Sequence, residues 1–495
     1  MEYMKFSVEL LGTSTTYMLP VLVLLVTGLA LMLLDAFTVR RPLMWIAAAG
    51  MTVSAAVAWL QGTVEERIVF FGMMETGGIA PLVHVFLCMS GILSLFFISD
   101  YLRRQQREVP DVYALLVFSV LGMALMANAN DLIMTFIGLE TMSMCLYIFA
   151  SLFKTEVSAN EAGLKYFLLG SFASAFMLFG ISIVYGMTGY TNFSMIARPE
   201  VLDILARPEN QPLFFVASGL LLIGFLFKVA AFPFHNWTPD VYEGTPTPLA
   251  GFMATGSKMA AFVAMGVVMQ KLNFAAYDKI ITVIALAALF TMIYGNIVAA
   301  RQQNLKRMLA YSSIAHSGYV LLGLCAGETG FKAIIFYMFI YTLMNIGAFG
   351  LVGMAERNYG DTDLEAWRGL GLKSPYFAAA MAIFLFSLAG IPPLAGFMSK
   401  YQVFISAIRE DLLFLATVGI LTSVIGAYYY IRVIVLMFFN SQGRMPEFNT
   451  RFAALPVVGT FLLVLLVLLF GVFPSLVLGP IETVFGTVAT TAALP

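Results

Sequence analysis

The sequence predicts an all-α polytopic membrane protein with about fourteen transmembrane helices, two of them discontinuous. Three observations support this fold class: a strongly apolar composition, a succession of apolar runs about 20 residues long, and two runs that glycine and proline interrupt. Of the 495 residues, 60% are hydrophobic and only 11% are charged, and the mean hydropathy is +0.90. Soluble domains carry about 25% charged residues, so most of the surface of this chain must face lipid.

The lengths of the apolar runs agree with the thickness of a bilayer, whose hydrocarbon core takes about 20 helical residues to cross. The first run follows MEYMKFSVEL and has no small-residue cleavage site. It is therefore expected to be a retained transmembrane helix and not a signal peptide. The expected spans are centred near residues 26, 52, 91, 120, 142, 174, 221, 259, 289, 315, 343, 390, 425 and 466.

The charges of the loops predict the orientation of the chain. Lysine and arginine are enriched in cytoplasmic loops. The larger share of the 27 Lys and Arg residues falls in one set of alternate loops, which includes Arg40, Arg41, Arg103 and Arg104. These loops are assigned to the inside, and an even number of spans then leaves both termini on the outer side.

Two apolar runs are interrupted by glycine and proline at membrane depth. The first reads LFKVAAFPFHNWTPDVYEGTPTP and contains Pro233, and the second reads FSLAGIPPLAGFMSKYQVF and contains Pro392 and Pro393. Proline removes a backbone N–H and clashes with the preceding turn, so both helices should break there. Lipid tolerates such breaks only where protein or a water-filled cavity satisfies the freed backbone groups.

The spacing of the two breaks predicts an internal repeat. They lie roughly 160 residues or about five spans apart, and paired interrupted spans are typical of transporters built from repeats. An odd number of spans in each unit would invert the second repeat relative to the first. The expected division is an N-terminal three-helix segment at 1–108, a first repeat at 109–273, a second repeat at 274–440, and a C-terminal helix and tail at 441–495.

Charged side chains stand within several of the apolar runs. A charge near the centre of a bilayer costs roughly 2.5–3.5 kcal/mol on insertion scales. One such residue could be an accident at a helix end, but four lysines and a glutamate in separate spans favour a proton relay. These residues are Glu140, Lys165, Lys228, Lys258 and Lys400.

Three of these charges carry most of the relay hypothesis. Glu140 lies roughly 13 Å deep by helical rise, and no cation stands three or four residues away, so its partner must come from another helix. Lys228 precedes the first break, and Lys258 lies too deep in its run to snorkel easily. A lysine that is alternately paired and unpaired changes its proton affinity, as a relay requires. The structural alternative is a static buried ion pair that fixes helix packing.

Three further candidates have stronger structural alternatives. Lys400 follows the second break and is either a relay end or an interfacial side chain that snorkels. Lys165 lies one turn after Glu161, so a local ion pair is the alternative. His316 lies among serines in RMLAYSSIAHSGYVLLGL and can pass protons between its two nitrogens, or it is a satisfied core histidine.

Composition and motifs exclude several other functions. The net charge of −1 argues against a nucleic-acid partner. The sequence has no phosphate loop, dinucleotide fingerprint or plausible Ser/His/Asp arrangement. Its cysteines stand apart in apolar runs, so neither an iron–sulfur cluster nor a structural zinc site is expected. They are Cys88, Cys145 and Cys325. No cofactor or metal is therefore expected in this chain.

Several segments resemble the antiporter-like subunits of proton-pumping NADH:quinone oxidoreductase (respiratory complex I), and the subunit-N branch of that Mrp-antiporter-related family most closely. The most specific segment is PFHNWTPDVYEGTPTP, from Pro233 to Pro248, followed by Lys258. The segments EAGLKYFLLGSFASAFMLFG, KRMLAYSSIAHSGY and GIPPLAGFMSKY add to it. The resemblance covers nearly the whole chain.

The resemblance implies fourteen transmembrane helices, two inverted five-helix repeats, and discontinuous seventh and twelfth helices. It also implies that Glu140 pairs with Lys228, that Lys258 is central, and that Lys400 lies toward the exit. The implied location is a bacterial inner (plasma) membrane. The implied partners are the other membrane-arm subunits, including sister antiporter-like subunits, and they would hold the FMN, iron–sulfur clusters and quinone that this chain lacks.

The function that the resemblance implies is proton translocation without local redox chemistry. A proton would enter from the inside toward Lys228 and Lys258, pass near His316 and leave through Lys400, driven by redox chemistry in other subunits. One alternative is a subunit of an Mrp-type cation/proton antiporter or of a related membrane-bound hydrogenase. Another is a structural membrane spacer whose buried charges only pack helices.

Overall fold

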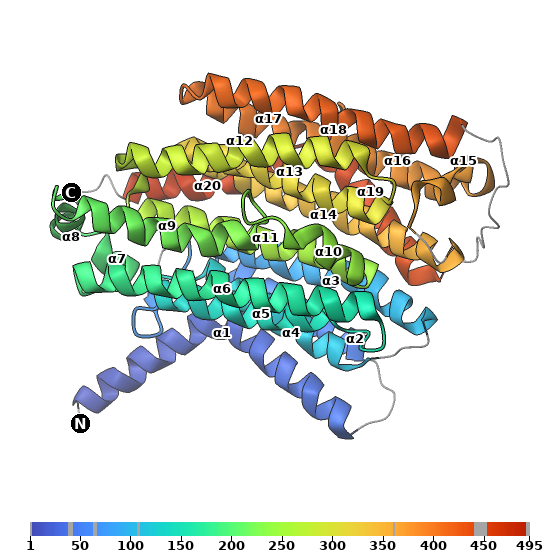
Figure 1. The fold of residues 1–495 in the computed structure, drawn as a ribbon. Coiled ribbons are helices and arrows are strands. Elements are labelled where there is room, and N and C mark those ends of the chain that lie inside the picture. Colours follow the sequence, from blue (N-terminus) through green and yellow to red (C-terminus); the bar gives the residue numbers. More distant parts are fainter. Residues whose placement is uncertain are drawn as a thin grey trace.

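The computed structural model describes residues 2–37, 43–62, 67–105, 109–359, 362–439 and 453–491, most of them in long helices that run along a common bundle (Figure 1). The helices of the first half are α1 (Glu2–Phe37), α2 (Leu43–Gln61), α3 (Ala80–Arg104), α4 (Asp111–Ala127), α5 (Leu132–Ala150), α6 (Val157–Thr188), α9 (Gln211–Lys228), α10 (Trp237–Gly244) and α11 (Thr247–Lys271). Those of the second half are α12 (Asp278–Arg301), α13 (Leu305–Cys325), α14 (Gly327–Tyr359), α16 (Pro375–Ala389), α17 (Ala395–Arg409), α18 (Leu413–Phe439), α19 (Ala454–Val472) and α20 (Ser475–Thr491).

The described helices include twelve that are long and apolar enough to cross a membrane. Two further apolar helices at predicted spans, α4 and α16, are shorter than these. Thirteen of the fourteen expected centres fall within helices, and the other, residue 390, lies at the break between α16 and α17. The number of helices that cross the bilayer stays a prediction. Of the four basic loop residues named for the orientation, Arg40 and Arg41 lie outside the described residues.

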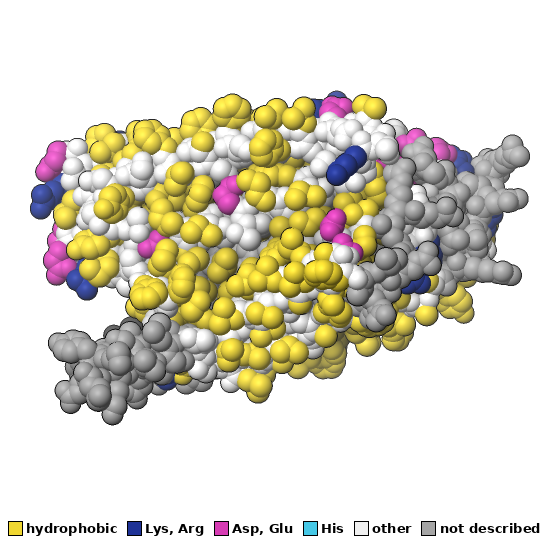
Figure 2. Space-filling view, turned by 90° about the horizontal axis from the view of Figure 1, so that it is seen from below, with side chains coloured by type: hydrophobic (Ala, Val, Ile, Leu, Met, Phe, Trp, Pro, Cys, Tyr) yellow, Lys and Arg dark blue, Asp and Glu magenta, His cyan; other side chains and the backbone are white. Residues whose placement is uncertain are grey.

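Hydrophobic side chains cover much of the described part of the face in Figure 2, and only isolated charged side chains, acidic and basic, interrupt them. On α6 the exposed positions are occupied by large apolar residues such as Leu164, Phe172 and Phe179. The same is true of α18, with Phe414, Leu421 and Val424. A soluble monomer rarely exposes so extended an apolar surface, so this chain is embedded in a membrane.

Both predicted helix breaks are present. The first separates α9 from α10, and the backbone there includes Ala230 at a positive φ of 59°. The second separates α16 from α17, and Gly390 ends α16 in the left-handed conformation at φ 86°. Glycine adopts this conformation without the steric penalty of a Cβ atom. The two discontinuous helices are therefore confirmed.

The helices around the two breaks follow one another in the same order. In each set of five, the fourth member is broken: α9–α10 after α4, α5 and α6, and α16–α17 after α12, α13 and α14. The first two helices of each set also pack closely through glycine. A Cβ at Gly122 of α4 would fall 2.4 Å from the backbone N of Met142, and one at Gly295 of α12 would fall 2.6 Å from that of Ala315. These parallels support the predicted repeats, whose boundaries stay a prediction.

Some elements were not predicted. A short antiparallel hairpin, β1 (Arg67–Val69) and β2 (Met74–Thr76), precedes α3. The remaining short elements lie in connections or after α19, where apolar periodicity gives no signal. Besides α20 they are α7 (Phe193–Ile196), α8 (Pro199–Ala206), η1 (Phe274–Ala276), η2 (Leu364–Trp367) and α15 (Leu370–Lys373).

Candidate functional site

Lys258 lies in the middle of α11 and is almost fully buried, with 1% of its surface exposed. Its ammonium group donates three hydrogen bonds to α13: to Ser313 O at 2.9 Å, to Ser313 Oγ at 2.6 Å and to Ser317 Oγ at 3.0 Å. An ammonium group has three donors, so neutral acceptors satisfy all of them. No carboxylate within the described residues forms an ion pair with Lys258, and this lysine is therefore free to exist in either protonation state.

Lys228 ends α9 immediately before the first break and is also buried. Its Nζ donates to Ser143 Oγ at 2.9 Å and to Tyr166 OH at 3.0 Å, and it lies 5.1 Å from the centroid of the Tyr166 ring. That ring in turn stacks on Trp237, the first residue of α10, at 4.4 Å. Hydroxyl groups and an aromatic face from α5 and α6 thus hold the lysine, and Trp237 of α10 packs behind the Tyr166 ring.

Glu140 does not pair directly with Lys228, contrary to the expectation from the resemblance. Its carboxylate accepts a hydrogen bond from Ser174 of α6, and no ion pair joins the two residues in this part of the chain. Lys228 Nζ instead donates a hydrogen bond to Ser143, which lies one turn beyond Glu140 on α5. Glu140 still lies close enough to Lys228 to attract it, so the coupling is electrostatic and passes across a hydroxyl group.

The freed backbone groups of the first break are satisfied by neutral side chains. Ser317 donates to Val229 O at 2.6 Å and Trp237 Nε1 donates to Phe227 O at 3.1 Å, while the Phe232 N–H donates to Thr291 Oγ1 at 2.8 Å. Because Ser317 also accepts from Lys258, this one hydroxyl connects Lys258 to the disrupted backbone.

His316 is buried at the centre of a cluster of tyrosines. Its Nδ1 lies 2.6 Å from Tyr337 OH and its Nε2 lies 3.3 Å from Tyr430 OH. Tyr430 in turn shares a short hydrogen bond with Ser312. The histidine is therefore bonded on both nitrogens, which is the arrangement that passing a proton through the ring requires, and the core-histidine alternative has the same geometry.

Lys400 lies one turn into α17 and is buried, with 6% of its surface exposed. Its Nζ donates to Ala389 O, the last residue of α16, at 3.0 Å and to Ser423 Oγ at 2.8 Å. It also lies 5.4 Å from the centroid of the Tyr319 ring. Lys400 therefore faces the second break and the protein interior, and the alternative of an interfacial lysine that snorkels is wrong.

A chain of amides and hydroxyls lies between His316 and Lys400. Tyr429, next to Tyr430 on α18, donates to Asn296 Oδ1 at 3.3 Å. Asn296 Nδ2 donates to the hydroxyl of Tyr319 at 2.9 Å, and the Tyr319 ring faces Lys400. Polar groups thus extend from the histidine to the second break.

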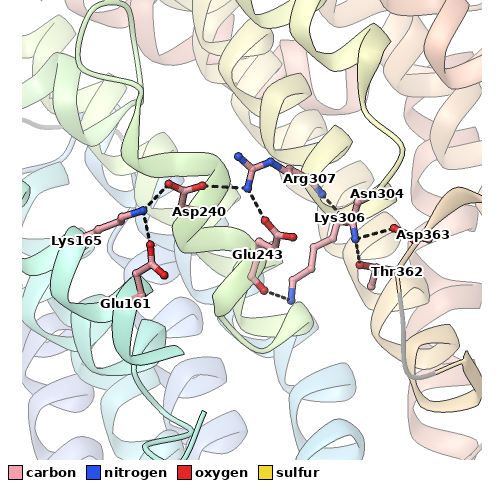
Figure 3. Close-up of polar contacts among 9 residues, drawn as sticks. All are labelled: Glu161, Lys165, Asp240, Glu243, Asn304, Lys306, Arg307, Thr362 and Asp363. Carbon is pink, nitrogen blue, oxygen red and sulfur yellow. Dashed lines mark hydrogen bonds and ion pairs between the residues drawn. The ribbon is translucent and has the colours of Figure 1, made fainter. Parts of the chain in front are cut away.

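Lys165 lies in a different environment from the other lysines. It forms ion pairs with Glu161 at 2.6 Å and with Asp240 at 2.9 Å, and 41% of its side chain is exposed (Figure 3). The local pair with Glu161, which was the structural alternative, is present. Lys165 is in the N-terminal part of α6. Its side chain is partly exposed, unlike those of the buried lysines.

The contacts of Lys165 continue across α10 to α13. Arg307 of α13 binds Asp240 at 3.0 Å and also binds Glu243 of α10 (Figure 3). We refer to Glu161, Lys165, Asp240, Arg307 and Glu243 as the ionic chain. Beside it Lys306, which is 4% exposed, donates to the carbonyls of Glu243 and Thr245 at 2.9 and 2.7 Å. Cations therefore bind both the acidic side chains of α10 and the carbonyls at its C-terminal end.

The structure gathers Lys258, His316 and Lys400 around α13, which carries the histidine itself and supplies serines to Lys258 and the Tyr319 ring to Lys400. Several of these contacts were not foreseen. Buried hydroxyl residues in apolar runs were the available signal, because each needs a hydrogen-bond partner. The residues that were missed are Ser143, Tyr166, Ser174, Asn296, Lys306, Tyr319, Tyr337, Ser423, Tyr429 and Tyr430. Among the described residues, no group of three His, Cys, Asp or Glu is placed to hold a metal ion.

A protein-family model described as "NADH:quinone oxidoreductase/Mrp antiporter, TM" matches residues 129–426. The chain belongs to this family. The matched region contains both breaks and all of the candidate relay residues, so the resemblance inferred from the sequence is confirmed.

Named relatives agree with this assignment. The chain is 41% identical over 420 residues to NADH-quinone oxidoreductase subunit N 1 of Chloroherpeton thalassium, covering 84% of this chain and 86% of the relative. It is 38% identical to NADH-quinone oxidoreductase subunit N of Salinibacter ruber, covering 94% of each.

Solved structures extend the comparison to three dimensions. A chain in respiratory complex I from Thermus thermophilus with bound aureothin matches with a TM-score of 0.77 and 32% identity, covering 93% of this chain and 98% of that one. A chain of the Mrp complex from Dietzia sp. matches with a TM-score of 0.83, 95% and 97% coverage and 19% identity, which shows a shared fold alone.

Proposed function

We propose that this chain moves protons across the membrane through a relay formed by Lys228, Lys258, His316 and Lys400, with Glu140 as an electrostatic modulator. The observation that carries the proposal is the environment of Lys258. A buried lysine whose three donors meet only neutral oxygens can give up its proton without leaving a carboxylate unpaired, unlike a lysine in a buried ion pair.

The proposed path begins at the arginine-rich end of the bundle, where α3 ends and α4, α11 and α13 begin. We assign this end to the inside, which places both termini outside. A proton taken up there reaches Lys258, and Ser317 links that lysine to the first break. Transfer continues past His316 and its tyrosines to Tyr319 and Lys400, from which the proton leaves at the opposite end.

Glu140 sets the charge state of Lys228 in this mechanism. Attraction between the carboxylate and the ammonium favours the protonated lysine, and a larger distance between Glu140 and Lys228 favours release of the proton. Lys165 contributes by holding α10 in place through Asp240. Its role in the relay is thus to position the broken helix, and the proton passes elsewhere.

Partner subunits supply the driving force. Moving one charge against 100 mV requires about 2.3 kcal/mol, and the chain carries no motif for a redox cofactor that could provide it. FMN, iron–sulfur clusters and quinone would belong to those partners.

The half-buried Glu140 shares an exposed face of α5 with Ile137, Met144 and Ile148. Because a carboxylate is disfavoured in lipid, a neighbouring membrane-arm subunit is expected to cover this face.

The test is Lys258→Ala in the assembled complex, with NADH oxidation and proton pumping measured in the same proteoliposomes. Pumping should fall by on the order of 100-fold, in the range that loss of an acid–base group produces, while assembly is retained. Lys258→Arg should also fail, because a guanidinium group does not release its proton. Normal pumping in either variant would contradict the proposal.

A matched control lies on the same helix. Lys271→Ala removes a lysine at the end of α11 that pairs loosely with Glu75 at 3.4 Å, and it should pump normally. If vesicles containing the Lys258→Ala protein still exchanged sodium for protons in the absence of NADH, the chain would instead be a cation/proton antiporter subunit.

A further inference from the structure

A polar cavity of about 240 Å³ opens at the arginine-rich end between α3, α11 and α14. Asp100, Tyr101 and Arg104 of α3 line one side, and Glu356 of α14 lines the other. The cavity has room for several water molecules. None of the relay residues described above lies in it.

The charges in the cavity favour cations over anions. Arg104 Nε is already paired with Asp100 at 2.7 Å, so the carboxylate of Glu356 is left in excess. Lys306 lies nearby and is attracted by Glu356, Glu243 and Glu156 together, but its Nζ is committed to backbone carbonyls. Two carboxylates against one guanidinium suit water and protons better than a phosphate headgroup.

Glu356 connects the cavity to the helix that carries Lys258. Its Oε2 accepts a hydrogen bond of 2.6 Å from Thr247, the first residue of α11. Thr247 and Lys258 are eleven residues apart, which places them on nearly the same face of the helix, about 16 Å from each other. The helix α11 packs against α14.

Polar atoms without partners continue along α14 toward Lys258. Asn345 Oδ1 and Tyr341 OH are fully buried and have no hydrogen-bond partner among the described residues, and the same is true of Tyr242 OH on α10. The two tyrosine hydroxyls approach Ser313, the main acceptor of Lys258, without reaching hydrogen-bond geometry. A buried polar atom left unpaired is costly, so these groups point to bound water.

A buried aromatic side chain, Phe349, lies along α14 between the cavity and these groups. Phe349 lies on α14 between Glu356 and Asn345 and is fully buried. It seats against Gly251 of α11, where an added Cβ would fall 2.7 Å from its own Cβ. The glycine therefore leaves space for the ring at the interface of the two helices.

We propose that this interface is the uptake branch of the relay: Glu356 takes protons from the cavity, Phe349 separates the cavity from the interior, and water held by Asn345, Tyr341 and Tyr242 carries protons to Lys258. The proposal rests on the proposed function. It adds an uptake residue and a barrier that the lysine–histidine relay does not contain.

The decisive variant is Tyr341→Phe in the purified complex in proteoliposomes. It removes a hydroxyl that makes no protein hydrogen bond, so a merely structural role would leave the pumping rate unchanged, whereas loss of a water ligand should slow it severalfold. Glu356→Gln should slow pumping by on the order of 100-fold, increasingly as the inner pH rises and protons become scarce, and Glu356→Asp should restore part of the rate. Glu365→Gln, an exposed acid paired with Arg368, is the control and should match the parent protein.

The outcomes distinguish this inference from the function on which it rests. If Lys258→Ala abolishes pumping while Tyr341→Phe and Glu356→Gln keep the parental rate and pH profile, the uptake branch is wrong and the relay stands. If Lys258→Ala pumps normally, both fail. Should Glu356→Gln not assemble, the Tyr341→Phe rate alone decides.

Discussion

The two helix breaks both contain a cis X-Pro peptide, but their freed carbonyls are satisfied by different chemistry. At the first break, the neutral side chains of Ser317 and Trp237 donate to the backbone. At the second, the relay lysine itself donates to Ala389 O. In the proposed relay, proton transfer and support of the freed carbonyls are therefore separate tasks at the first break, whereas at the second Lys400 has both.

The position seven residues after each cis proline shows the same difference. In the second half this position is Lys400, buried at the break. In the first half it is Asp240, which lies 35% exposed in the ionic chain. The first half instead places its buried cation, Lys228, before the break. Corresponding positions of the two repeats thus carry opposite charges at different depths.

The largest expected difference between the breaks is in stability. Lys400→Ala should abolish pumping and also destabilise the subunit by about 1–3 kcal/mol, because Ala389 O loses a buried partner. Lys228→Ala should impair pumping with a smaller loss of stability, since the Ser143 and Tyr166 hydroxyls can turn to other acceptors. Thermal unfolding of the purified complexes measures this difference.

A neutral donor at the second break separates the two roles. Lys400→Gln retains an N–H donor and should recover part of the stability that Lys400→Ala loses, without recovering pumping. Equal stability losses in Lys400→Ala and Lys228→Ala would show instead that the two breaks are supported alike.

The first break should depend on Ser317 in the way that the second depends on Lys400. Ser317→Ala leaves Val229 O unpaired and removes one of three acceptors from Lys258, so it should lower stability by about 1–3 kcal/mol and slow pumping. The control is Ser119→Ala on α4, because this buried hydroxyl has no partner among the described residues and its removal should be neutral or stabilising. If Ser317→Ala and Ser119→Ala had the same stability and pumping rate, Ser317 would have no role in the site.

Glu140 and Lys228 test whether the first break is controlled across a hydroxyl group. In a double-mutant cycle, Glu140→Gln and Lys228→Ala should couple by about 0.5–3 kcal/mol in the free energy of activation for pumping. Ser143→Ala should strengthen this coupling, because it removes the hydroxyl that holds the ammonium. Additive losses would mean that each residue acts through a different partner.

The sequence was sufficient to predict the membrane class, the approximate positions of the spans and both breaks. These follow from features that act locally: apolar length decides whether a helix crosses lipid, and proline removes a backbone donor wherever it stands. Lys258 and Lys400 were found in the same way, since a charge within an apolar run needs no knowledge of neighbouring helices.

The partners of these charges could not be predicted, because they come from helices distant in the sequence. Nothing in the apolar runs indicates that Ser313 would meet Lys258, or that Ser143 would stand between Glu140 and Lys228. Lys306 looked like an ordinary loop cation next to Arg307. Burial beneath α10 distinguishes it, and that depends on how the break folds back against α13.

The smallest expected effect is at the ionic chain, where the first half carries Asp240 in the position of Lys400. Its ion pairs are partly exposed, so Asp240→Asn should lower stability by only about 0.2–1 kcal/mol, and by less at high salt. Lys332→Gln, which breaks the Glu328 pair beside the start of α14, is a control of similar exposure. If Asp240→Asn instead abolished pumping as completely as Lys400→Ala, the corresponding positions would share one function despite their opposite charges, and the division of tasks between the two breaks would fail.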